Sequence, residues 1–358
     1  MFYYCESLIS FELGNVDTSS VTNMGYMFGN CYSLISLDLS HFDTSLVTNM
    51  EYMFNGCTGI KSIDLSSFYI SNVNNMRYMF YNCKSLLTIN LTNLYSLKAI
   101  DMSYMFYSCN SIKGIHFPKN NKIYLKNVEH MFFECFNLQS LDLQSFDTSN
   151  VTYMDNMFDG LNNLEQLTNI NFDISKVTSM VKTFACLHRL STLDLTNLTS
   201  SNNYINMSSM FYHSYGLNNI YFNKSSILKS NNMKYMFYEC KNLISLDLTN
   251  FDTSKVTDMS NMFHECKSIK FINLTNFDTS LVANMNNTFY LCEKLNYINV
   301  SSFNTLSVKN MYEMFECCHS LKSLDLSNFY ISHDAEINYI FEHCSLDYIN
   351  IYNFQTSL

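Results

Sequence analysis

The sequence predicts an α/β solenoid: a curved array of about fourteen repeats of 26 residues, with short parallel strands on the concave side and short helices on the convex side. An anchor Phe recurs every 26 residues, apart from one step of 27. Self-similarity at a fixed period is typical of solenoids. An alternating segment and a segment of helical period lie within each repeat. The anchors are Phe2, Phe28, Phe54, Phe80, Phe106, Phe132, Phe158, Phe184, Phe211, Phe237, Phe263, Phe289, Phe315 and Phe341.

The alternating segment predicts the strand. In one regular repeat it reads Ile60-x-x-Ile63-x-Leu65. Alternation of apolar residues at Ile63 and Leu65 indicates a short strand with one face turned inward. The pattern Leu-x-x-Leu-x-Leu is the signature of leucine-rich repeats.

The segment that leads to the anchor predicts a short helix. Val73, Met76, Phe80 and Cys83 are spaced by three, four and three residues, which places them on one helical stripe. In the preceding repeat, Thr48 with the Glu three residues later has the sequence of an N-cap and its capping box. Because two helical turns are marginal alone, neighbouring repeats must cover the stripe.

Three residue types mark positions that we interpret as core. All 22 Met lie one or four residues before an anchor, on the face of the predicted helix that carries it. Eleven of the 13 Cys lie three residues after an anchor, and Leu161 and Ser214 replace Cys in two repeats. Such thiols behave as small hydrophobes, although disulfides between adjacent repeats remain possible at this spacing. A Phe spine follows the strands at Phe42, Phe68, Phe146, Phe172, Phe251, Phe277, Phe303, Phe329 and Phe354.

Residues that flank the inward strand positions form two outward columns, and these columns are the predicted binding surface. The first holds mainly Ser and Thr, and the second mainly Asp and Asn. His116, Phe271 and Tyr297 interrupt the pattern, and a local site is most expected there. Calcium held by consecutive carboxylates is an alternative, but the amide, hydroxyl and Tyr interruptions fit no fixed cage. The candidate binding residues are Asp38, Asp64, Asn90, His116, Asp142, Asp194, Tyr221, Asp247, Phe271, Asn273, Tyr297, Asn299 and Asp325.

Composition and motifs argue against other classes of function. The net charge of -10 disfavours nucleic acid, whose phosphates need clustered Lys and Arg. No run of 18 apolar residues is present, so we expect no membrane insertion. The sequence has no nucleophile elbow, phosphate loop or metal-ligand spacing of Cys and His, so we expect no enzyme, metal or cofactor.

The domain organisation expected from the repeats is a single array over residues 1–358, uncapped at both ends. The sequence begins at the anchor Met1-Phe2 and stops inside another repeat. Solenoids normally carry terminal caps with a polar outer face. We therefore expect a fragment, or an array that associates end to end.

The repeat resembles the BspA-like leucine-rich-repeat surface proteins. The resemblance covers nearly the whole chain and lies in Met-Phe-x-x-Cys, as in Met262-Phe263-His264-Glu265-Cys266, and in the segment Ser245–Met259, which reads SLDLTNFDTSKVTDM. It implies a surface or secreted array that binds host matrix proteins or other cells, with no shared catalytic residues. Repeats near 90–125 and 195–232 depart from the pattern.

The function predicted from these observations is non-enzymatic protein binding, with cell-surface adhesion or host recognition through the concave strand face. The localisation that the resemblance implies is the cell surface or the exterior. An intracellular scaffold or regulatory binding array is the alternative. Structural wall or coat material is a third possibility, which ordered self-assembly would mark.

Overall fold

The computed structural model describes the chain except residues 13, 15, 95–97, 352–354 and 357–358. Contacts divide the chain into two compact units, Met1–Lys176 (unit 1) and Val177–Leu358 (unit 2). Each unit is a parallel β-solenoid, and the two together contain about 13 turns. The fourteen anchors of the sequence delimit thirteen complete intervals, which explains the difference from the predicted count. The prediction of one continuous array is untested by this division and stays a prediction.

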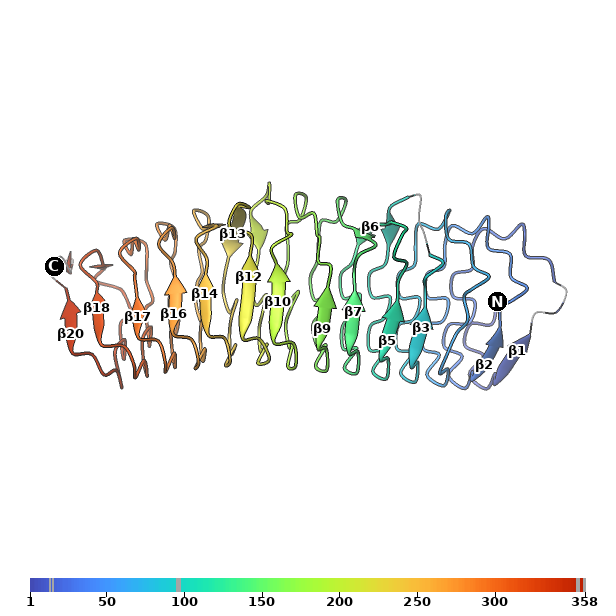
Figure 1. Cartoon of the computed structure of the whole chain (residues 1–358), viewed down its shortest axis with the longest axis horizontal. Coiled ribbons are helices and arrows are strands. Elements are labelled where there is room, and N and C mark those ends of the chain that lie inside the picture. The colour runs from blue at the N-terminus through green and yellow to red at the C-terminus, as the bar shows by residue number, and fades with distance from the viewer. Residues whose placement is uncertain (13, 15, 95–97, 352–354, 357–358) are drawn as a thin grey trace. The chain divides into compact units, whose positions relative to one another are not determined.

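The strands of unit 1 are short and all of their pairings are parallel (Figure 1). One row of strands, β3-β5-β7-β9, forms the predicted strand side, and β1 pairs with β2 in the same slot of earlier turns. A second row, β4-β6-β8, lies at another side of the turns. The strands are β1 Ser10–Glu12, β2 Ser36–Asp38, β3 Thr88–Asn90, β4 Ile100–Asp101, β5 Gly114–His116, β6 Ile123–Asn127, β7 Ser140–Asp142, β8 Phe146–Asp147 and β9 Gln166–Thr168.

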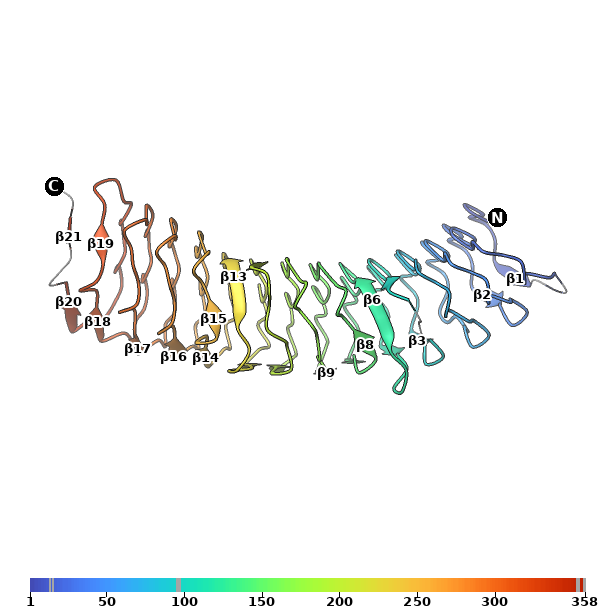
Figure 2. The same ribbon diagram turned by 90° about the horizontal axis from the view of Figure 1, so that it is seen from above.

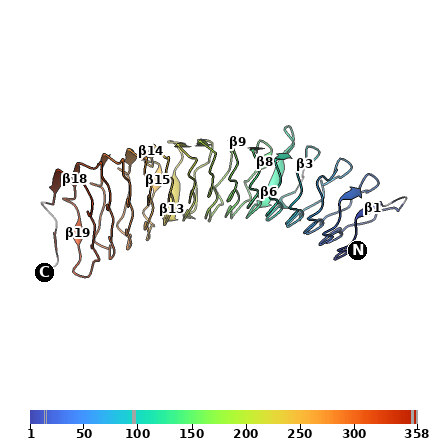
Figure 3. The same cartoon turned by 90° about the horizontal axis from the view of Figure 1, so that it is seen from below.

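Unit 2 repeats this arrangement. Its strand side is formed by β10-β12, β14-β16-β17 and β18-β20, and its second row by β11-β13-β15 and β19-β21. The longest strands, β6 in unit 1 and β13 in unit 2, stand out in Figure 2, and Figure 3 shows them from the opposite side. The strands are β10 Thr192–Leu195, β11 Ile205–Asn206, β12 Asn219–Phe222, β13 Leu228–Asn232, β14 Ser245–Asp247, β15 Phe251–Asp252, β16 Phe271–Asn273, β17 Tyr297–Ile298, β18 Ser323–Asp325, β19 Tyr330–Ile331, β20 Tyr348–Asn350 and β21 Gln355–Thr356.

The predicted helices are wrong, because none of the described residues is helical. The anchor segment is a row of consecutive tight turns instead, in which Met27 N donates to Met24 O (3.3 Å). Tyr26 and Asn30 have φ of 58° and 60°, the left-handed region that a right-handed helix excludes. Every second N–H then leaves the segment, so that Phe28 N donates to Met53 O in the next turn (2.9 Å).

This alternation explains why the apolar spacing predicts a helix in a segment that forms tight turns. Tight turns with bonds from residue i to residue i−3 bring every third or fourth side chain to the same side, much as a helix does. The predicted capping box is also absent, because Thr48 Oγ1 donates to Thr22 O (3.2 Å) in the neighbouring turn. The predicted convex side of short helices is therefore absent from the described residues.

The predicted core is confirmed. The anchors from Phe28 to Phe315 are fully enclosed and stack on their neighbours within each unit, for example at 5.4 Å between the ring centroids of Phe80 and Phe106. Twenty of the Met are buried, whereas Met1 is exposed and Met27 is half-buried. The Phe spine is buried from Phe42 to Phe329, and Phe354 lies outside the described residues.

All 13 cysteines are free thiols, and nine of them are buried. Each buried thiol donates to the carbonyl of the anchor one turn earlier, as Cys57 Sγ does to Phe28 O (3.2 Å). Ser214 makes the equivalent bond to Phe184 O (2.7 Å), which explains why Ser can replace Cys in this slot. The interpretation of the Cys as core residues is therefore confirmed, and the disulfide alternative is not realised in the structure.

The Phe-Asp-Thr-Ser segment links each turn to the next by hydrogen bonds. Thr44 is fully buried. Its Oγ1 donates to Tyr69 O (3.0 Å) and accepts from Tyr69 N (2.7 Å). Because both bonds reach the same backbone residue one turn away, Thr fixes the spacing of successive turns at this corner. The same pair of bonds links Thr305 with Tyr330 in unit 2.

Candidate ligand-binding face

The two outward columns lie in register on the strand side, as the alternation predicts. In unit 1, Ser10 pairs with Ser36 and Glu12 with Asp38. In unit 2, Ser245 pairs with Phe271. The inward residue of each strand is buried or half-buried, so the flanking side chains face outward. We call the two columns of each unit its strand face.

The second column has a structural task that the sequence reading missed. The Oδ1 atom of Asp38 accepts the backbone N–H of Ser40 (2.9 Å), which closes an Asx turn at the end of β2. Asp64, Asn90, Asp142, Asp194, Asp247, Asn273, Asn299 and Asp325 make the same contact with the residue two positions on. One oxygen of each side chain is thus committed to folding.

Hydrogen bonds favour the charged form of two carboxylates in this column, Asp38 and Asp247. Hydrogen bonds from the side chain and the backbone of Ser40 lower the pKa of Asp38 below its ordinary value. At Asp247, partial burial raises the pKa, but hydrogen bonds from Thr249 and Lys224 outweigh this and lower it. The strand face therefore presents fixed negative charges between neutral Asn, Ser and Thr.

A hollow of about 650 Å³ opens on the strand face of unit 1. Three predicted residues, Asn90, His116 and Asp142, line it from the adjacent strands β3, β5 and β7. The loop after β5 forms its rim, so the irregular turn that the sequence singled out has produced a concave site. The remaining lining residues are Thr92, Gly114, Ile115, Phe117, Pro118, Lys119, Asn120, Asn121 and Ser140.

Unit 2 has two smaller hollows on its strand face. One, of about 190 Å³, lies beside Tyr221 and Asp247. The other, of about 210 Å³, lies beside Tyr297, Asn299 and Asp325. The predicted residues outside these three hollows are Asp38, Asp64, Asp194, Phe271 and Asn273, and they lie on the open parts of the strand faces.

The hollows include residues that the sequence reading did not select. Lys224 Nζ lies 3.1 Å from Asp247 Oδ2 across the rim of the smaller site, and Lys119 lines the larger one. Both Lys follow a strand in a repeat that departs from the consensus. That shared departure from the consensus is the signal in the sequence that could have found them.

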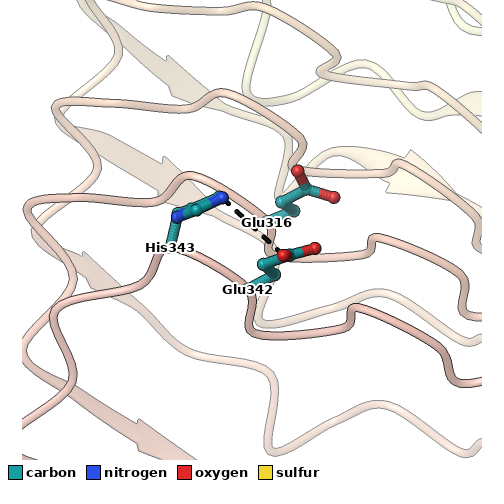
Figure 4. Close-up of side chains that lie close together, drawn as sticks. All are labelled: Glu316, Glu342 and His343. Atoms are coloured by element: carbon teal, nitrogen blue, oxygen red, sulfur yellow. Dashed lines mark ion pairs between the residues drawn. The ribbon is translucent and has the colours of Figure 1, made fainter.

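One cluster outside the strand face has the residue types of a metal site. Glu316, Glu342 and His343 hold one potential ligand atom each, all within 4.8 Å of one another (Figure 4). His343 Nε2 lies 3.7 Å from Glu342 Oε1. Partial burial and the neighbouring Glu313 and Glu342 raise the pKa of Glu316. The sequence contains its signal, since Glu316 follows its anchor in the slot that holds Tyr212, Tyr238 and Tyr290 in earlier turns of unit 2. The cluster is largely exposed, and carboxylates gather on surfaces without ions, so we assign it no function.

The described residues contain no helix that is long and apolar enough to cross a bilayer.

Parallel strands in register, at a period of about 26 residues and with an inward apolar residue that is usually Leu or Ile, define a leucine-rich-repeat-type solenoid protein. The chain belongs to the family described as "Mycoplasma protein of unknown function, DUF285", which matches residues 1–117, 126–243 and 231–354.

A solved structure supports the fold. A leucine-rich repeat protein from Bacteroides ovatus is 16% identical, with a TM-score of 0.58 over 97% of this chain and 85% of that one. A leucine-rich repeat protein from Leptospira interrogans is 11% identical over 99% of this chain and 90% of that one, but its TM-score of 0.30 is too low to support a shared fold. No curated protein matches the chain. At these identities, the first likeness establishes the fold alone.

Proposed function

We propose that this chain is a non-enzymatic protein-binding array, of the BspA-like adhesion type, that docks its partner on the strand face. The observation that carries the proposal is the exposure of large aromatic rings there, at Tyr221 (51%), Phe271 (45%) and Tyr297 (53%). Aromatic side chains dominate the energy of protein interfaces. These three rings stand exposed within otherwise polar columns.

The chemistry of the face suits recognition of a partner segment rather than catalysis. At Asp38 and Asp64, Oδ1 closes the Asx turn and the second oxygen is left for a ligand, whereas Asp247 Oδ2 pairs with Lys224. The carboxylates of Glu12 and Asp38 lie in register on paired strands. A partner with basic or amide side chains along an extended surface would meet successive acceptors. The proposed partner is a host extracellular matrix or cell-surface protein, and the proposed location is the cell surface or the exterior.

The test is capture of host matrix proteins and of intact cells by the purified chain. We expect binding that a double variant, Phe271→Ser with Tyr297→Ser, weakens by about tenfold or more. The matched control is Tyr69→Ser with Tyr153→Ser, which removes two exposed rings (61% and 48%) outside the two columns. Absence of binding by the folded chain, or equal loss in both variants, would contradict the proposal.

A second candidate is an intracellular scaffold or regulatory binding array. The 13 free thiols favour it, because reducing compartments keep Cys unpaired. Protease treatment of intact cells discriminates the two: degradation of the chain supports a surface location, and protection supports the scaffold. End-to-end self-association remains a prediction for either location, and sedimentation at increasing concentration would test it.

A further inference from the structure

Two turns, one in each unit, share the same departure from the repeat. The segments 114–132 and 219–237 lie four repeats apart. Each replaces the regular Leu-Asp-Leu by Ile-x-Phe and then places a Lys two residues on, at Lys119 and Lys224. Each then continues into a five-residue strand, β6 or β13. We call these segments the variant turns.

The variant turns use the same packing device. The ring of Phe117 meets that of Phe146 edge-on, with centroids 4.8 Å apart and an interplanar angle of 76°. The ring of Phe222 meets that of Phe251 in the same way, at 5.1 Å and 89°. Since Phe146 and Phe251 belong to the Phe spine of the following turn, each new Phe packs against that spine.

Each variant turn also lines a hollow, and the linings correspond by repeat position. Unit 1 supplies Thr92, His116, Lys119 and Asp142. Unit 2 supplies Thr196, Tyr221, Lys224 and Asp247 in the same four slots. Elsewhere the second column has Asp, Asn, Glu or Thr, and His116 and Tyr221 are its only rings. A ring, a Lys and an Asp therefore come together twice.

The chemistry of these sites favours a neutral ligand rich in hydroxyl groups. At the unit 2 site, Lys224 pairs with Asp247 (3.1 Å), so a charged ligand would have to break an ion pair. Asp247 also accepts from Thr249 Oγ1 (2.8 Å), which leaves donors and acceptors closely interleaved around the rim. Adjacent sugar hydroxyls both donate and accept, and thus match carboxylate, ammonium and hydroxyl groups together.

The ring of Tyr221 supplies an apolar contact surface, which the polar groups of the hollow lack. Tyr221 is half exposed at the edge of the hollow, so one face or edge of its ring can pack against the C–H groups of a pyranose. The apolar residues of the floor, Ile220 and Phe222, belong to the strand itself. The hollow therefore has room for a saccharide unit but no deep apolar socket of the kind that anchors a protein side chain.

We propose that each variant turn forms a saccharide-binding subsite, so that the chain binds two equivalents of an oligosaccharide. The unit 2 subsite shares Tyr221 with the protein-docking surface proposed above, but Phe271 and Tyr297 of that surface lie outside both subsites.

The experiment is a panel of defined glycans probed with the full chain, followed by calorimetry with the free oligosaccharide that binds most strongly. We expect two sites per chain. Tyr221→Ala is expected to remove one site and leave the other, and His116→Ala with Tyr221→Ala to weaken binding overall by about tenfold or more. Asp64→Asn is the control, since it lies in the same Asx slot without a neighbouring ring.

Absence of any retained glycan, or unchanged affinity and stoichiometry in the double variant, would overturn the proposal. Circular dichroism establishes that each variant is folded. If the ring variants fail to fold, Lys119→Ala with Lys224→Ala replaces them, because both Lys side chains are exposed. Capture of a protein partner that persists when no glycan binds would overturn the saccharide subsites while leaving the protein-binding proposal intact.

Discussion

The stacked Phe anchors make a quantitative prediction for one interior residue, Phe106. Its side chain is fully buried, and its ring lies between those of Phe80 and Phe132 at centroid distances of 5.4 and 5.9 Å. Truncation of a buried Phe to Ala removes the transfer free energy and leaves a cavity, which together cost about 3–5 kcal/mol. Each lost ring pair contributes about 0.5–1.5 kcal/mol of this. Because both neighbouring rings belong to the stacked anchors of the same unit, we expect the loss of stability in Phe106→Ala to lie near the upper end of the range of about 3–5 kcal/mol.

Urea unfolding followed by far-UV circular dichroism measures the loss. Phe271→Ala is the matched control, since this Phe lies half exposed on the strand face and its truncation is expected to change stability by less than about 0.5 kcal/mol. Unchanged slopes of the unfolding curves would establish that the midpoints report stability. A loss of less than about 1.5 kcal/mol for Phe106→Ala, or equal losses for the two variants, would refute the assignment of the anchors as the main core.

Three other predictions follow from buried or turn-forming side chains. A thiol reagent should label exposed Cys5 in the folded chain but leave Cys57 unlabelled until denaturant is added. The reason is that burial raises the pKa of Cys57 to about 12. Rapid labelling of Cys57 in the folded chain would contradict this. Asp64→Ala should lose about 0.5–1.5 kcal/mol by removing the acceptor for Ser66 N, whereas Asp64→Asn should be nearly neutral in the same unfolding assay. Burial lowers the pKa of His264 in the folded chain. The free energy of unfolding that this contributes is fully present above the unfolded-state pKa and is lost as the pH falls through the folded-state value. His264→Tyr should therefore reduce the fall in Tm between about pH 7 and pH 5.

The periodicity predicted the core because the same slot meets the same neighbours in every turn. Met50, Cys57 and Phe42 are buried for this reason, and their burial follows from their spacing alone. The strands were likewise predictable from alternation, since one inward residue between two outward ones has few other interpretations. Residues that repeat in a solenoid are therefore safely read as structural.

The backbone of the anchor segment could not be predicted from spacing. Consecutive tight turns and a helix both place apolar residues three or four apart, and only the left-handed φ values separate them. Tyr26, Tyr52, Tyr78 and Tyr104 hold such values, although a bulky ring is uncommon there. Their rings stack in sequence, as at 4.4 Å between Tyr52 and Tyr78, and this tertiary contact, which no single repeat encodes, offsets the local strain.

The Asx turns were not predicted from the sequence, whereas a local site was expected at His116, and a hollow lies there. Asp38 and its equivalents recur in nearly every turn and close an Asx turn there, and regular recurrence is what such a folding role produces. His116, Tyr221, Lys119 and Lys224 break the recurrence, and the structure places them around concave sites. In a repeat protein the stacking of turns imposes the consensus residue on every slot. A residue type that departs from the consensus in two equivalent turns, together with the same changes at neighbouring positions, is therefore better evidence of a ligand site than a column of identical residues.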